Sequence, residues 1–114
     1  MRTIFKYPLV MDAVVQTVEM PKDAIILSAG MDPHNNICIW AMVDTEEEKE
    51  DRKVFIFGTG WDVTDFIDAV GSMDFIDTVK SEFYMWHLFI DSKDTEEMIE
   101  EIDNDSNEND GDAE

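Results

Sequence analysis

The chain has 114 residues, with 28 acidic and 8 basic side chains, a formal net charge of −20 and a pI of about 4.1. This length predicts one domain. A content of 44 % hydrophobic residues is sufficient for a buried core, but the chain is too short to contain a cofactor domain as well. The charge argues against a general binder of DNA, RNA or anionic membrane, because such proteins neutralise phosphates with Lys and Arg.

The apolar and β-branched runs of the first half are typical of β-strands. Residues 37–43 are apolar at both odd and even positions, so both faces of a strand would be apolar. This pattern predicts a central strand that is covered on both faces. Pro8 is expected to end the first strand or to confine it to a sheet edge. The expected strands and apolar runs cover 3–7, 14–18, 24–28, 37–43 and 54–57, with a loop over 30–36 and a charged hairpin loop over 45–53.

Two helices and one further strand are expected in the second half. Val63, Phe66, Ile67 and Val70 have the spacing of a helical apolar face, and Gly71 is expected to stop that helix. Residues 83–90 form an aromatic-rich run that predicts a strand. A short helix over about 94–102 begins with acids that suit the helix dipole. The fold class is therefore α+β but mainly β: a compact antiparallel sheet, small barrel or sandwich.

The charge is unevenly distributed along the chain. Residues 1–90 carry 16 acidic and 7 basic side chains, a net charge of −9, whereas residues 91–114 carry 12 and 1, a net charge of −11. Residues 103–114 have no large apolar side chain to offset the entropy of ordering. We expect a β-rich core domain over 1–90 and an acidic extension over 91–114 that ends in a disordered tail.

Twelve acids make up the candidate partner-binding surface. On the first expected helix, a spacing of three puts Asp62, Asp65 and Asp68 on one broad side, and Asp74 and Asp77 continue that row. In the second helix, acids recur about every 2–2.5 Å, close to the one charge per about 1.7 Å of duplex DNA. This crowding costs stability, so it indicates either a solubilising surface or a surface that binds a basic, nucleic-acid-handling protein. The twelve are Asp62, Asp65, Asp68, Asp74, Asp77, Asp94, Glu96, Glu97, Glu100, Glu101, Asp103 and Asp105.

Three other sequence patterns do not match known functional motifs. The Gly58-Thr59-Gly60 turn lacks the lysine of a phosphate loop, and nearby acids would repel an anion. The tail fails the calcium-loop pattern in both registers, from Asp103 and from Asp105. No serine or cysteine has a visible catalytic base.

Three residues could ligate a metal in principle, but their spacing does not resemble a zinc site. His34 is expected on a loop, and Cys38 and His87 on apolar strands; as the single cysteine, Cys38 excludes an internal disulfide. We expect His87 to be a hydrogen-bonded residue of its strand. No metal and no cofactor is predicted.

Five segments of residues 2–90 occur in a recognisable order. The most specific are a TIFKYPL-type opening strand (residues 3–9) and a WHLF-type strand (86–89), with the Gly58–Gly60 turn between them. The other two are 39–44 and 75–79. Together these segments resemble a family of small proteins encoded by tailed bacteriophages and prophages. The resemblance implies a phage origin and transfers no functional residue. The usual members of that family end soon after the Trp-His strand, so the extension from Asp91 departs from its pattern.

A phage origin favours a specific class of function, because small acidic phage proteins often resemble double-stranded DNA in charge and block host DNA-binding proteins. The sequence therefore predicts a non-enzymatic DNA mimic that inhibits a basic host nucleic-acid-binding or defence protein in the host cytoplasm. It predicts no direct binding to nucleic acid or membrane, and it leaves monomer and homodimer open. The alternative is a virion or replication accessory protein whose acidic tail only solubilises. A magnesium-dependent hydrolase or nuclease is a third hypothesis.

Overall fold

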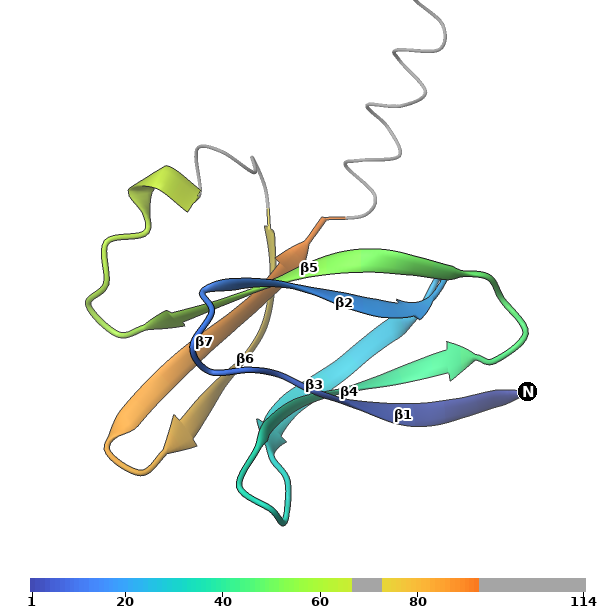
Figure 1. Ribbon diagram of the computed structural model, residues 1–114, viewed down its shortest axis with the longest axis horizontal. Helices are drawn as coiled ribbons and strands as arrows, with labels where there is room; N and C mark the ends of the chain where they lie inside the picture. The colour runs from blue at the N-terminus through green and yellow to red at the C-terminus, as the bar shows by residue number, and fades with distance from the viewer. Residues whose placement is uncertain (67–72, 93–114) are drawn as a thin grey trace, which may run out of the picture.

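The computed structural model describes residues 1–66 and 73–92 of the chain. Within these residues, seven strands form two antiparallel sheets (Figure 1), one of order β1-β4-β3 and one of order β2-β5-β7-β6. The expectation of a mainly β fold is confirmed. The strands are β1 (Arg2–Pro8), β2 (Val15–Pro21), β3 (Ile25–Met31), β4 (Ile37–Asp44), β5 (Lys49–Gly58), β6 (Met73–Ser81) and β7 (Tyr84–Asp91).

The core lies between the two sheets, and both contribute to it. Ile37 and Ile39 of β4 pack there with Leu9, which follows β1. The four-stranded sheet contributes a larger set from β5, β6 and β7. As expected from its apolar sequence, β4 is the central strand of its sheet, and Pro8 lies on the outer strand β1. The core residues of the four-stranded sheet are Val54, Ile56, Val79, Leu88 and Ile90.

Several expected boundaries are wrong because strand pairing extends beyond the apolar runs. The charged residues 49–53 were expected in a loop, but β5 begins at Lys49, which pairs with Pro21 of β2. Residues 73–81 form strand β6, which the sequence did not predict. Phe83 lies in the turn before β7 and is 94 % exposed. Of the first expected helix, residues 64–66 are helical; the remainder, and the whole second helix, lie outside the described residues.

The β3–β4 loop is organised by one buried carboxylate. Asp32 Oδ1 accepts hydrogen bonds from the backbone N–H groups of His34 and Asn36, both at 2.9 Å. Its Oδ2 forms an ion pair with Lys6 Nζ of β1 at 2.9 Å. The N–H of Asn36, followed by Lys6, holds the pKa of Asp32 well below its usual range. The hydrogen bond between the Lys6 ammonium and the Asp32 carboxylate also raises the pKa of Lys6. This carboxylate therefore fastens an outer strand to the loop.

We expect Asp32→Asn to reduce the acid sensitivity of the fold. Because the folded pKa of Asp32 lies below its unfolded value of about 3.9, its contribution to stability is complete above that value and is lost as the pH falls through it and below. Thermal unfolding near neutral pH and near pH ~3 measures the effect. The wild type should lose more of its melting temperature on acidification than Asp32→Asn does. The exposed Asp74, changed to Asn, is the control and should keep the wild-type pH dependence; equal acid sensitivity of all three proteins would contradict this role.

A second ion pair, between Arg52 of β5 and Asp91 at the end of β7, lies at the edge of the core. Arg52 Nε donates to Asp91 Oδ1 at 2.8 Å, and Arg52 Nη2 donates to the backbone carbonyl of Asp91 at 2.9 Å. The backbone N–H of Lys53 donates to Asp91 Oδ2 at 3.1 Å. The side chains of Arg52 and Asp91 are only 8 % and 15 % exposed. These contacts fix the point from which the acidic extension continues.

Candidate functional site

The predicted row of acids is divided between two elements of the structure. Asp62 lies in the segment after β5, and Asp65 lies in the helical turn at 64–66. Asp74 and Asp77, which were expected to continue the row of acids beyond the helix, lie on strand β6, which pairs with β7. The other candidate residues lie outside the described residues: Asp68, Asp94, Glu96, Glu97, Glu100, Glu101, Asp103 and Asp105.

Asp77 has a structural role. Its Oδ2 accepts a hydrogen bond from the backbone N–H of Ala29 on β3 at 3.3 Å, and its Oδ1 accepts one from Thr78 at 2.9 Å. The register of β6 against β7 shifts between Phe75 and Asp77, as in a β-bulge. The carboxylate therefore bridges the two sheets where β3 lies beside β6. It is half-buried.

Residues 59–66 cover the end of β5. A Cβ on Gly58 would lie 2.8 Å from the indole ring of Trp61, so only glycine permits this close approach. Asp62 Oδ1 accepts a hydrogen bond from the N–H of Thr64 at 3.0 Å, which lowers the pKa of Asp62 and caps the helical turn. The ring of Phe66 packs on Phe57 of β5, with 5.5 Å between centroids.

A cavity of about 300 Å³, the β5-end pocket, opens beside this segment. Both ring nitrogens of His87 in its wall are already hydrogen-bonded, Nε2 to Thr59 Oγ1 at 2.7 Å and Nδ1 to Thr78 Oγ1 at 3.1 Å. The expectation that His87 is a hydrogen-bonded strand residue is confirmed. The lining is mostly apolar and comprises Phe57, Val63, Met73 and Phe89, together with Gly58, Thr59, Gly60 and His87.

Sequence reasoning did not bring Thr59 and His87 together, because they are 28 residues apart. A hydroxyl beside an imidazole is a pairing that nucleophilic catalysis uses. In catalytic triads a carboxylate orients the other ring nitrogen, whereas here that nitrogen faces the hydroxyl of Thr78. The contact ties the glycine turn to β7 and helps to shape the pocket.

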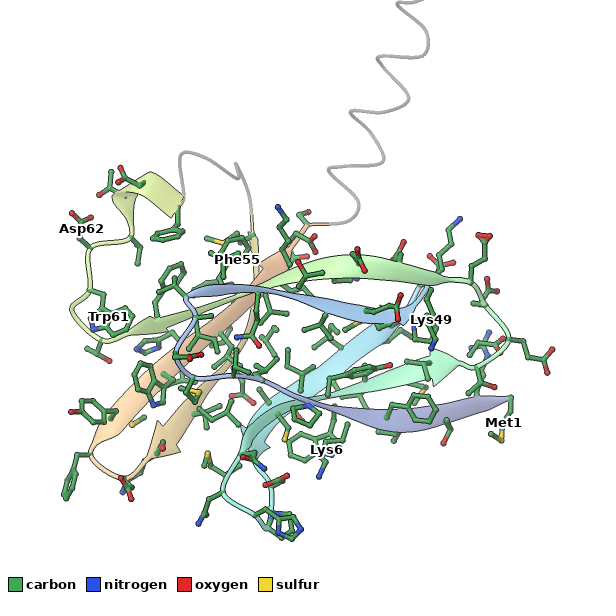
Figure 2. The ribbon with its side chains drawn as sticks, viewed as in Figure 1. Met1, Lys6, Lys49, Phe55, Trp61 and Asp62 are labelled. Atoms are coloured by element: carbon green, nitrogen blue, oxygen red, sulfur yellow. The ribbon has the colours of Figure 1, made fainter. Side chains whose placement is uncertain are left out.

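Three of the predicted acids are close in the chain to residues that line the β5-end pocket, and we call Asp62, Asp65 and Asp74 the acidic rim. Asp62 directly precedes the lining residue Val63, and Asp65 follows it by two positions. Asp74 follows the lining residue Met73 on β6, and because successive side chains of a strand point to opposite faces, it lies on the other face of that strand. All three are exposed. Figure 2 shows Asp62 and Trp61 at the opposite end of the molecule from Lys49 and Met1. The fold places these three acids on two elements, the segment after β5 and strand β6.

Aromatic side chains lie next to the acidic rim. The ring of Trp61 meets that of Trp86 edge to face with 5.6 Å between centroids, and the ring of Tyr84 also lies 5.6 Å from that of Trp86. Trp61 is 50 % exposed, and Tyr84 is 62 % exposed. Exposed indole and phenol faces attract Arg and Lys side chains. The aromatic and acidic groups at this end therefore favour the same kind of ligand, a cation.

The three candidate metal ligands are not assembled into one site. His34 lies in the loop between β3 and β4, Cys38 is buried on β4, and His87 lies on β7 of the other sheet. Burial raises the pKa of the Cys38 thiol, which disfavours the thiolate that binds metals. Within residues 1–66 and 73–92, no group of three or more His, Cys, Asp or Glu side chains is placed to hold a metal ion.

The described fold can now be compared with known proteins. A family model with the description "Domain of unknown function (DUF7352)" matches residues 1–98. The chain belongs to this family. The DUF7352 match spans both sheets and the acidic rim. No curated protein and no solved structure matches the chain significantly. Among the helical residues that are described, none belongs to a helix long and apolar enough to cross a membrane.

Proposed function

We propose that this protein is a non-enzymatic, phage-encoded inhibitor that occupies the basic surface of a host nucleic-acid-binding or defence protein as an acidic DNA mimic. One observation carries the proposal: the most acidic part of the chain begins beside the acidic rim. Asp91, the last residue of β7, pairs with Met73, the neighbour of Asp74. The 12 acids of residues 91–114 therefore continue from the end of the sheet at which an exposed rim carboxylate already lies.

The proposed mimic surface is confined to this end of the molecule. Asp77 is tied to β3, and the exposed Glu46, Glu47 and Glu48 lie in the β4–β5 turn, next to Lys49 at the far end (Figure 2). The rim carboxylates are exposed and can pair with Arg and Lys of a partner, and the low pKa of Asp62 favours its charged form. Binding between such complementary charges is fast and weakens with salt.

The proposal is tested by the salt dependence and the DNA competition of binding. The full chain is used to capture proteins from a bacterial host lysate at low salt, and each captured protein is purified. The affinity of the captured protein for the chain is then measured between about 50 and 500 mM salt. We expect a nucleic-acid-binding protein whose affinity falls at least tenfold over this range and which duplex DNA displaces from the chain. Binding that is unchanged by salt, or that DNA does not compete with, would refute electrostatic mimicry.

A matched pair of triple variants tests the place of the surface. Asp62→Asn/Asp65→Asn/Asp74→Asn removes the acidic rim, and Glu46→Gln/Glu47→Gln/Glu48→Gln removes the same number of charges at the far end. We expect the first triple to weaken binding to the captured partner about tenfold or more and the second to weaken it less than threefold. Equal losses would mean that only the total charge matters, as for a solubilising surface.

One observation favours the alternative of a virion or replication accessory protein. Ile4, Met42 and Ile25 lie in register across β1, β4 and β3, and they are 53 %, 37 % and 55 % exposed. An apolar row of this kind is suited to contact with another protein surface. Light scattering of the wild type and of Ile4→Glu/Ile25→Glu separates the candidates: an assembly protein loses an oligomer in the variant, whereas the mimic keeps its mass and its partner affinity.

A further inference from the structure

We propose that the β5-end pocket receives one large apolar side chain from a basic segment of the partner, and that Arg or Lys residues flanking this anchor pair with Asp62 and Asp65 of the acidic rim. The inference rests on the proposed function, because it assumes a basic partner. It goes further in assigning an apolar anchoring site that a DNA mimic acting by charge alone would not need.

The size of the pocket fits a side chain better than a cofactor. Its volume of about 300 Å³ is at the lower limit of the range of about 300–1,000 Å³ that is typical of pockets for whole small molecules. Phe57 at its base is 4 % exposed, and Phe89 packs on Phe57 with 5.9 Å between centroids. The base is therefore formed by packed rings on the four-stranded sheet.

The polar groups of the wall favour an apolar occupant. The imidazole of His87 has hydrogen bonds at both nitrogens, and the hydroxyl of Thr59 is used in one of them. The other side chains of the wall, those of Phe57, Val63, Met73 and Phe89, are apolar. A polar ligand would lose its hydrogen bonds to water and find few replacements. An aliphatic or aromatic side chain would gain from leaving water.

The charge around the pocket indicates which residues lie next to the apolar anchor in the partner segment. Asp62 and Asp65 precede and follow the lining residue Val63 in the chain, and Trp61, the neighbour of Asp62, is half-exposed. Carboxylates form bidentate hydrogen bonds with guanidinium groups, and indole faces attract them. An apolar core with a polar rim is the usual arrangement of a protein interface. The complementary ligand is a segment in which Arg or Lys residues enclose one large apolar residue.

Two synthetic peptides of equal charge test the inference on the full chain. They are acetyl-Arg-Arg-Trp-Arg-Arg-amide and the same peptide with Ala in place of Trp, and isothermal titration calorimetry gives the Kd of each. We expect the Trp peptide to bind wild-type protein about tenfold more tightly, from burial of the indole. Val63→Trp, which fills the pocket from within, should abolish this preference and leave the Ala peptide unchanged. Leu27→Trp, on an exposed position of β3, is the matched control and should keep the preference.

Each outcome separates this inference from the proposed function. Equal affinities of the two peptides for wild-type protein, or an unchanged preference in a folded Val63→Trp variant, would overturn the anchoring site, while salt-sensitive binding of both peptides would leave the mimic intact. Failure of both peptides to bind at low salt would also overturn the anchoring site. If circular dichroism shows that Val63→Trp is unfolded, Met73→Trp fills the same pocket from β6 and carries the same expectation. The rim triple variant should weaken both peptides alike.

Discussion

Asp91→Ala is expected to lower the free energy of unfolding by about 3–5 kcal/mol. The substitution would leave the guanidinium of Arg52, whose side chain is only 8 % exposed, without its carboxylate, and the N–H of Lys53 without an acceptor. A charge left unpaired in a buried place costs far more than the net gain from forming the pair. Urea denaturation measures the loss, provided that the slope of the free energy against urea is unchanged.

The control for Asp91→Ala is a substitution that removes a more exposed ion pair. Asp44→Ala removes a pair with the N-terminal amine, in which the side chains are 35 % and 75 % exposed, and it should cost less than about 1 kcal/mol. The double variant Arg52→Met/Asp91→Leu replaces both charges and should recover much of the stability. A loss below about 1 kcal/mol for Asp91→Ala would show that water reaches the pair freely. Since Asp91 precedes the acidic extension, partner affinity should be compared only among folded variants.

Leu88→Ala is expected to lower the free energy of unfolding by about 2–5 kcal/mol. Leu88 has no exposed surface and lies on β7, which is paired on both sides by β5 and β6. Its neighbours belong to paired strands, so they cannot collapse fully into the space left by the lost methyl groups. For a domain whose total stability is about 5–15 kcal/mol, this loss is a large fraction.

Met85→Ala on the same strand is the matched control. Met85 is 43 % exposed, so its substitution should change stability by no more than about 0.5 kcal/mol. Chemical denaturation of the three proteins gives the comparison. If both variants lost the same stability, the core would not lie between the sheets as described.

The candidate site was only partly accessible to sequence reasoning. Its charge was visible in the sequence, but of the acids expected on the first helix only Asp65 lies in the helical turn at 64–66, and Asp62 lies before that turn. The β5-end pocket was not visible, because its walls come from β5, β6, β7 and the segment after β5. No local pattern brings Met73 to Val63, and no spacing rule pairs Thr59 with His87. The one signal available was the pair of glycines at 58 and 60, which indicated a tight turn but not what it encloses.

By itself, the sequence determined which segments needed burial and where the charge accumulated. Residues 37–43 were expected to be covered on both faces because odd and even positions are both apolar; Ile37, Cys38 and Ile39 are buried, whereas Met42 is 37 % exposed. The excess of 28 acids over 8 bases argued against a general binder of nucleic acid or anionic membrane. The tertiary structure alone decided that 73–81 is a strand, since Phe75, Ile76 and Val79 fit either a helix face or a bulged strand until β7 pairs with them. It also decided the roles of the acids. A carboxylate becomes structural when a backbone N–H from another strand reaches it, as Ala29 reaches Asp77, and it stays available to a partner when none does.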